Sequence, residues 1–534
     1  MKRSTIFWIT VLILGVLFDF LFWKQSPGIN FAIYAVLVLG GGYLVLELNG
    51  FKASWKSLLL LVPILFFTVM TFVRLEPLSM FLAFAFTLGL MGLLAVSYLG
   101  GRWLRYSLAD YIFNYVKLAV SMISRPILFV LEGKKKAETA PAQTSGAGRN
   151  PGWDRFWAIL RGVLIALPIL VIFIALLASA DLVFAQRVQD FVRLFRLENL
   201  PQYIFRCFYI LAGAYALAGV FLHAAQKSKD EKLAGMDKPL IPQFLGFTEA
   251  SVVLGAVVLL FALFAIIQFQ YFFGGLTNIS LQGYTYAEYA RRGFGELVVV
   301  AFFSLLLFLG LGAVVKRQNQ TQRWVFSGLG LGMVALVGVM LYSAFQRLVL
   351  YEAAYGFSRL RAYTHIFMIW LGILLAVVVV LDILRKERAF ALAILLASIG
   401  FAVTLNLLNV DGFIVRQNVA RAASGSPLDV AYLASLSTDS VPTLVNDLLD
   451  KSLPAGTRDA VGASLACRVY NERVLNISAD WRSFTLSRWQ SGQALGRADV
   501  KVLLGAYNIP EDVSPAQVET PGGGKYDCYG SGMN

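Results

Sequence analysis

The sequence predicts an all-α integral membrane protein with about eleven transmembrane helices and a C-terminal helical extracytoplasmic domain. Of its 534 residues, 58% are hydrophobic and only 15% are charged, whereas soluble domains average about 45–50% apolar and about 25% charged residues. Apolar runs long enough to span a bilayer recur through roughly the first 410 residues. Transmembrane barrels are excluded, because their strands alternate in short segments of about ten residues.

Eleven apolar segments account for the predicted spans. They cover residues 5–23, 31–48, 58–73, 78–99, 157–178, 203–224, 247–271, 294–315, 325–346, 365–384 and 389–408. Lys2 and Arg3 precede the first run, as they would in a signal peptide. No small-residue cleavage site follows that run, so we expect the first helix to be retained.

The distribution of Lys and Arg predicts the orientation. If the N-terminus is cytoplasmic, every loop on the cytoplasmic side is basic, as the positive-inside rule requires. The formal charge of +14 is concentrated in the membrane region, because residues 410–534 carry 11 Lys and Arg against 13 Asp and Glu. Such a balance reflects loop topology and anionic lipids, and we expect no nucleic-acid partner. An odd number of spans then places residues 410–534 outside the cytoplasm.

Composition divides the chain into four regions. Residues 1–131 form a four-span N-terminal region, in which segment 103–131 is expected to be an amphipathic helix on the cytoplasmic surface. Residues 132–152 contain no large apolar side chain and predict a flexible cytoplasmic linker. Residues 153–409 form a seven-span membrane core, and residues 410–534 a soluble helical extracytoplasmic tail. If segment 103–131 crosses the membrane instead, every later orientation inverts.

Charged and tyrosine side chains gather at the outer ends of three predicted spans. The clusters cover residues 284–296, 347–363 and 406–416, and charge is costly at membrane depth unless it is paired. If the first cluster is helical, its acidic and basic residues recur every four positions and can form ion pairs. The candidate binding residues are Glu288, Arg291, Arg292, Glu296, Glu352, Arg359, Arg361 and Asp411.

Three interpretations of these clusters remain open. They form a structural ion-pair network that locks three loops together, or they bind an anionic lipid or lipid-linked headgroup, with arginine as the phosphate or carboxylate ligand. The third interpretation is a membrane-embedded transferase acting on a lipid-linked substrate, with Glu288 or Asp411 as general base. We expect a non-enzymatic component that senses, scaffolds or transports an envelope constituent through an outward-facing site.

The three cysteines and two histidines argue against a metal centre. No CxxC motif occurs, and His223 and His365 fall in different predicted spans, so no metal or other cofactor is expected. Cys467 and Cys528 both lie in the tail, which the charge argument places in an oxidising compartment. The two cysteines therefore form a disulfide, or, in the alternative, are two independent thiols.

Five motifs resemble a known family of bacterial multi-pass proteins. They are YTYAEYARRGFGEL, LYEAAYGFSRLRAYT, NVDGFIVRQNVAR, LDVAYLASLSTDSVPTL and DWRSFTLSR, and they span roughly residues 280–490. The family is catalogued as domain of unknown function four-one-seven-three, with its relative four-one-five-three. The resemblance implies a protein of the bacterial cytoplasmic membrane with a helical extracytoplasmic tail, and it brings no established activity.

Overall fold

Long apolar helices dominate the computed structural model. It describes residues 4–138, scattered residues between 162 and 187, and residues 200–229, 233, 243–273, 294–475, 480–510 and 516–529. Eleven of the described helices are long and apolar enough to cross a membrane, and sheet is limited to one two-stranded hairpin there. The all-α membrane fold is confirmed.

The membrane region contains most of the helices. They are α1 (Ser4–Phe22), α2 (Ile29–Leu48), α3 (Trp55–Leu58), α4 (Leu61–Val73), α5 (Pro77–Ser97), α6 (Leu108–Glu138), α9 (Leu200–Gln226), α10 (Phe247–Phe273), α13 (Phe294–Val314), α14 (Gln320–Tyr355), α15 (Arg359–Ile383) and α16 (Phe390–Leu408). Ten of the eleven candidate spans coincide with predicted ones, and the eleventh is Leu108–Glu132. Most of the predicted span 157–178 lies outside the described residues.

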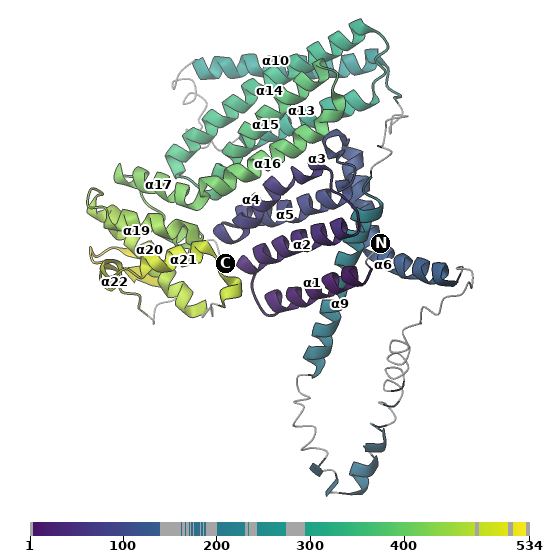
Figure 1. Ribbon diagram of the computed structural model, residues 1–534. Coiled ribbons are helices and arrows are strands. Elements are labelled where there is room, and N and C mark those ends of the chain that lie inside the picture. Colours follow the sequence, from purple (N-terminus) through teal and green to yellow (C-terminus); the bar gives the residue numbers. More distant parts are fainter. Residues whose placement is uncertain are drawn as a thin grey trace. The chain divides into compact units, whose positions relative to one another are not determined.

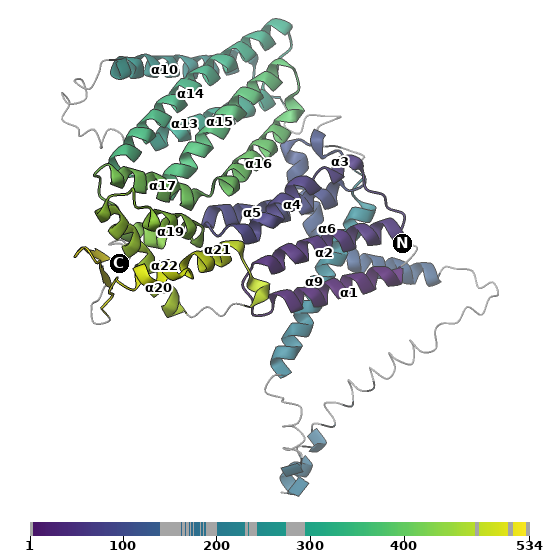
Figure 2. The same ribbon diagram turned by 60° about the vertical axis from the view of Figure 1, so that its left-hand side comes forward.

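The described chain forms two compact units. One contains residues 1–4, 21–120 and 220–534, and the other contains residues 5–20 and 121–219. Within the larger unit, α13, α14, α15 and α16 lie side by side in both Figure 1 and Figure 2. Within the smaller unit, Gly15 of α1 packs directly on Ile210 and Ala214 of α9.

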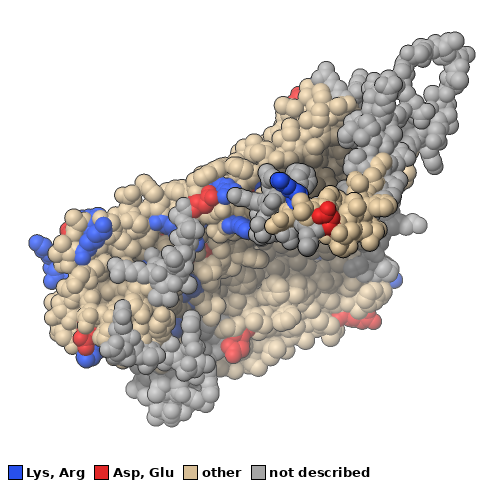
Figure 3. Space-filling view, turned by 90° about the horizontal axis from the view of Figure 1, so that it is seen from below, with Lys and Arg blue, Asp and Glu red and all other residues tan. Residues whose placement is uncertain are grey.

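The outer surfaces of the long helices carry large apolar side chains. Val62 and Leu259 are each 72% exposed, and charged side chains are sparse over the described surface drawn in Figure 3. Contiguous exposed apolar surface of this extent needs an apolar solvent. A bilayer provides one, which agrees with the lengths of the helices.

The tail consists of short helices and a small hairpin. They are α17 (Val410–Ala423), α18 (Val430–Ser435), α19 (Val441–Leu449), α20 (Ala455–Leu475), α21 (Leu486–Leu495), α22 (Ala498–Leu504), β1 (Gln517–Glu519) and β2 (Lys525–Asp527). The Gly-rich end turns the hairpin: Gly523 has φ +81°, and β1 pairs antiparallel with β2.

One hydrophobic core joins the tail to the membrane helices. Ile366 of α15 and Leu405 of α16 are buried together with Ile414, Leu444 and Leu465 of the tail. Because apolar burial contributes about 25 cal/mol per Å², this shared core fixes the tail against the helix ends. The disulfide Cys467–Cys528 closes a second core within the tail, with Cα atoms 5.2 Å apart.

Two polar residues at the start of α17 have different roles. The N-cap is Asn409, whose side-chain oxygen accepts the Gly412 N–H at 3.1 Å. Asp411 lies in the first turn, where its carboxylate is occupied by Arg359 and Ser437. Asn409 has φ +51°, a left-handed conformation that asparagine tolerates better than most residues.

We expect Asp447→Asn to stabilise the protein near neutral pH. Burial in α19, reinforced by Asp450, raises the pKa of Asp447 to about 6, so the folded state favours the protonated acid. The free energy of unfolding therefore falls as pH rises from about 4 to about 6. Over this interval Asp447 is ionised in the unfolded chain but still protonated in the folded protein. A shift of one pKa unit corresponds to about 1.4 kcal/mol, and partial exposure of Asp447 reduces this value. Asp447→Asn should therefore raise the free energy of unfolding by about 1–2 kcal/mol.

Melting of the detergent-solubilised full chain at pH 5 and pH 7.5 measures this effect. The difference between Asp447→Asn and wild type should grow with pH. Asp499→Asn is the control, because Asp499 is half exposed and pairs with Arg497 on the surface. A difference that stays constant between the two pH values would show that the carboxylate of Asp447 ionises normally.

Candidate functional site

The loops at one end of the membrane helices meet the tail in a polar junction. It consists of the α4–α5 loop, the α14–α15 loop, the α16–α17 boundary and the tail residues that contact them. At the sequence level this region contains two of the three predicted clusters, residues 347–363 and 406–416. The junction lies within the larger compact unit.

A buried ion pair joins the second cluster to the third. Arg359 Nε and an Nη atom donate to the two carboxylate oxygens of Asp411 at 2.8 and 2.7 Å. Asp411 is fully buried and also accepts the backbone N–H of Ser437 at 2.6 Å. The bidentate geometry and the third donor compensate the cost of removing both charges from water. Arg359 and Asp411 therefore connect α15 to α17 and to the segment between α18 and α19.

Two acidic residues that the sequence analysis does not select complete the junction. Asp439 accepts the backbone N–H groups of Leu75 and Glu76, each at 2.8 Å. Glu76 caps α5 by accepting the N–H of Ser79 at 2.7 Å, and Tyr363 of α15 donates to the same carboxylate. An acid directly before Pro77 is a sequence signature of a helix N-terminus and could have identified Glu76. No local pattern identifies Asp439.

Glu352 pairs with His365 across the α14–α15 turn. Their side chains are 2.9 Å apart, and Glu352 is buried. The His365 ring also packs edge-to-face on Phe345, with centroids 4.4 Å apart. One turn earlier on α14, Arg347 donates to Gln268 of α10 at 2.7 Å. These contacts hold α14 against α10 and α15. The Glu352 carboxylate therefore faces protein and not solvent.

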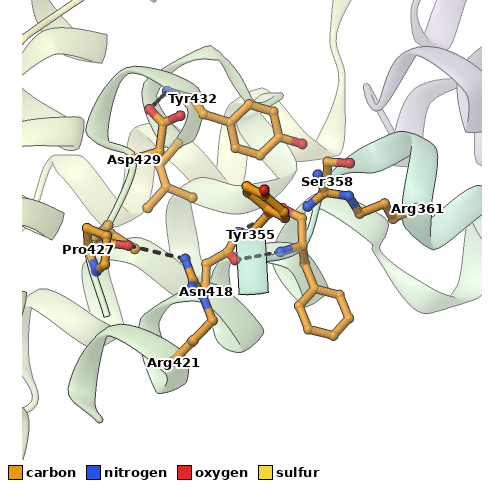
Figure 4. Close-up of a pocket in the computed structure, with 11 residues that line it drawn as sticks. Tyr355, Ser358, Arg361, Asn418, Arg421, Pro427, Asp429 and Tyr432 are labelled. Atoms are coloured by element: carbon orange, nitrogen blue, oxygen red, sulfur yellow. Dashed lines mark hydrogen bonds between the residues drawn. The ribbon is translucent and has the colours of Figure 1, made fainter. Parts of the chain in front are cut away.

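A pocket of about 190 Å³ opens beside this network. Its lining residues come from the α14–α15 turn, α17 and α18: Tyr355, Phe357, Ser358, Arg361, Asn418, Arg421, Pro427, Leu428, Asp429, Tyr432 and Leu433. Figure 4 shows Arg361 and Arg421 approaching it from opposite sides, with Asn418 and Tyr355 between them. We call it the Arg361–Arg421 pocket.

Neither arginine of this pocket has a carboxylate partner among the described residues. Arg421 donates to the carbonyl oxygens of Ala354 and Pro427 at 3.2 and 3.3 Å. Arg361 donates to the Gly356 carbonyl and lies over the Tyr351 ring, 4.1 Å from its centroid. Both guanidinium groups are thus held in place by neutral groups, and their positive charges are not neutralised there.

The other polar groups of the pocket are mostly neutral. Burial raises the pKa of the Tyr432 hydroxyl, so this group stays protonated at neutral pH. Asp429 is the one carboxylate in the lining, and it caps α18 by accepting the Tyr432 N–H at 2.9 Å. The pocket therefore presents guanidinium, amide and hydroxyl donors, a set that suits an anion.

Gly356 shapes the pocket wall. It has φ +79° and ψ 178°, a conformation that is essentially limited to glycine. A Cβ at this position would lie 2.6 Å from the Asn418 side-chain oxygen and 3.2 Å from an Arg421 nitrogen. The α14–α15 turn can therefore approach α17 closely only because residue 356 has no side chain.

The structure places the predicted binding residues differently from one another. Glu352, Arg359, Arg361 and Asp411 come together in the junction, although only Arg361 lines the pocket. Glu296 is exposed in the first turn of α13. Glu288, Arg291 and Arg292 lie outside the described residues, so a site shared by all three clusters stays a prediction. Arg421, Asn418 and Tyr432 are the pocket residues that the sequence analysis misses.

The described residues hold no group of three or more His, Cys, Asp or Glu side chains that could bind a metal ion. Fold and junction together define a multi-pass helical membrane protein whose helical tail is anchored to the loops at one end of its spans. The chain belongs to the family described as Domain of unknown function (DUF4153), whose sequence pattern matches residues 61–446. That family is the second of the two related families that the motifs resemble. No curated protein and no solved structure matches the chain.

Proposed function

We propose that this protein is a non-catalytic component of the bacterial cytoplasmic membrane that binds an anionic headgroup in the Arg361–Arg421 pocket. The ligand is the phosphate or carboxylate of a lipid or lipid-linked envelope constituent, and the bound state serves sensing, scaffolding or transport. The observation that carries the proposal is the pair of guanidinium groups, fixed by neutral contacts, that face one cavity without a carboxylate partner. Binding would supply the missing negative charge.

A catalytic role is less well supported. In the transferase alternative, Asp411 or Glu288 acts as general base. Asp411 is fully buried, and its two oxygens already accept three hydrogen bonds. A general base must reach the proton it removes, and Asp411 faces Arg359 and Ser437 instead.

The pairing of α1 with α9 supports an extracytoplasmic tail. Phe18 stacks on Tyr209 with centroids 4.8 Å apart, and Asp19 pairs with Arg206 at 2.5 Å, so the end of α1 lies beside the beginning of α9. The helices are therefore antiparallel, and an even number of crossings lies between them. From the end of α9, the five further spans α10, α13, α14, α15 and α16 bring the chain to the side opposite Ser4.

Contacts of α6 support a surface position for that helix. In the smaller unit, Phe129 contacts Phe7 and Trp8 near the start of α1, with centroids 6.4 Å apart in both cases. The beginning of α6 follows the end of α5, which alternation places on that same side. A helix that crossed the bilayer would instead have Phe129 near the end of α1. One further crossing is then needed between α6 and α9, and the sequence predicts segment 157–178 for it.

Cysteine labelling tests this orientation. In a Cys207→Ala background, Ser145→Cys in the linker and Ser424→Cys in the exposed turn after α17 are treated in intact cells with a membrane-impermeant maleimide. We expect labelling of Ser424→Cys alone, with both positions labelled after lysis. Labelling of the linker position in intact cells would invert the orientation and contradict the proposal.

Native mass spectrometry of the purified full chain tests headgroup binding. We expect wild type to retain phosphatidylglycerol in preference to phosphatidylcholine. Arg361→Gln/Arg421→Gln should weaken the binding of phosphatidylglycerol at least tenfold. This is a change of about 1.4 kcal/mol or more in binding free energy, which equals the loss of one charge-assisted hydrogen bond. The control Arg482→Gln/Arg497→Gln removes two surface guanidinium groups that pair with neighbouring Asp480 and Asp499. If both double variants are folded and retain phosphatidylglycerol equally well, the proposal is wrong.

A further inference from the structure

A second and larger cavity lies at the other end of the membrane helices. It has a volume of about 930 Å³ and is bounded by the segments after α5, after α13 and after α15, and by the first turn of α14. Its lining includes Arg102, Arg105, Arg317, Arg323, Arg385 and Arg388. Lys386 adds a seventh cation, and no Asp or Glu is among the described lining residues. We call this cavity the arginine cleft.

One guanidinium group of the cleft is built into the protein. Arg317 pairs with the buried carboxylate of Asp382 at 3.1 Å, and Ser327 donates to the same carboxylate. The Arg317 guanidinium also lies 4.7 Å from the centroid of the Phe326 ring. Asp382 therefore orients one of the seven cations that line the cleft.

The positive-inside rule alone does not explain this composition. The rule is satisfied equally by lysine and arginine, and neighbouring basic positions at the same end are lysines, such as Lys52 and Lys56. Six of the seven cations in the cleft are arginines. Arginine presents a planar fork of donors that matches phosphate oxygens, whereas lysine is a hydrated point charge.

The backbone of Arg385 is a second, independent sign of function. Arg385 is the second residue after α15 and has φ +58°, and the Lys386 N–H closes the helix on Leu381 O at 2.8 Å. This left-handed position at a helix C-terminus is usually glycine, because any side chain is strained there. An arginine at this position retains a cation beside the cleft at the cost of backbone strain.

We propose that the arginine cleft binds a ligand that carries two or more phosphate groups. The cavity volume is within the range of about 300–1,000 Å³ typical of small-molecule sites. Arg105, Arg323, Arg385 and Lys386 form no ion pair with a described carboxylate, and these four cations need more than one anionic group for neutrality. The phosphates belong to a lipid headgroup or to a soluble organophosphate, which present the same chemistry. This site is separate from the Arg361–Arg421 pocket and does not depend on the function proposed for that pocket.

The first arm of the test uses inorganic diphosphate and the purified full chain in detergent. We expect saturable binding by isothermal titration calorimetry that weakens strongly between 50 and 500 mM salt, because exposed charges are screened. Arg105→Gln/Arg323→Gln, at two exposed cleft residues, should weaken binding at least tenfold. Lys52→Gln/Lys56→Gln removes two charges from the same end outside the cleft and should leave the affinity within twofold.

The second arm identifies the source of the phosphate. The same proteins are titrated with cardiolipin, which carries two phosphodiesters, and bound lipid is counted by native mass spectrometry. Arg-dependent binding of cardiolipin assigns the cleft to a lipid headgroup, whereas Arg-dependent binding of diphosphate alone assigns it to a soluble ligand. Either result supports the proposal. Absence of binding by both probes, or equal losses in the arginine and lysine variants, would overturn it.

Discussion

Replacing Arg359 by methionine is expected to destabilise the protein by about 3–5 kcal/mol, the cost of leaving a buried charge without its partner. Asp411 is fully buried, so in this variant its carboxylate keeps only the Ser437 N–H as a donor. Removal of both partners, in Arg359→Met/Asp411→Asn, should recover part of that loss, because no unpaired charge then stays buried.

A double-mutant cycle measured by denaturant or thermal unfolding of the full chain separates these contributions. The coupling free energy between Arg359 and Asp411 should exceed about 1.5 kcal/mol, in the range of residues that share one network. Arg497→Gln is the control, because its partner Asp499 is half exposed and such surface pairs contribute about 0–1 kcal/mol. Single variants as stable as wild type would mean that water reaches the Asp411 carboxylate.

Loss of the disulfide is the second large effect. The bridge joins α20 to the segment after β2 across a sequence separation of 61 residues. On the chain-entropy estimate, such a closure stabilises the folded state by about 4 kcal/mol. Cys467→Ala/Cys528→Ala should therefore lower the melting temperature of the protein by several degrees, and reductant should lower that of wild type but not that of the variant.

Cys207→Ala provides the matched control, since Cys207 is an unbridged, exposed cysteine in α9. It should melt within about a degree of wild type. Thiol counting adds an independent readout: non-reduced protein should expose one reactive thiol after denaturation, and reduced protein three. Three reactive thiols without reductant would contradict the bridge.

The sequence predicts the membrane helices well because each apolar run is a local property. Ten spans match the structure, and the boundaries of α16 agree with the predicted segment 389–408 to within one residue. Compartment and location within the tail leave the Cys467–Cys528 disulfide as one of two alternatives, and the structure brings these residues together. Charge near membrane depth needs a partner, which makes Arg359 and Asp411 candidate residues, and these two side chains contact each other.

Other residues of the junction could not be predicted, because their role depends on distant contacts. Asp439 accepts hydrogen bonds from the backbone N–H groups of residues 75 and 76. The sequence around Asp439 does not indicate these distant partners. Arg421 is one of several arginines on the tail helices, and only the close approach allowed by Gly356 brings it to the pocket. The arginine cleft is similarly assembled from loops that are far apart in the sequence, and no local pattern shows that these loops meet.

The hydrogen bonds between the tail and the earliest helices have a consequence for biosynthesis. Ile29 N–H, at the start of α2, donates to Phe484 O at 2.9 Å, and Asp439 completes the loop before α5. At about 5–20 residues per second, translation of the 455 residues between Ile29 and Phe484 takes roughly 25–90 s. During that interval the loop before α2 is without its final partner. The first helices to be inserted are therefore among the last to be completed, and nascent chains that stop before Asp439 should be preferred substrates for membrane proteolysis.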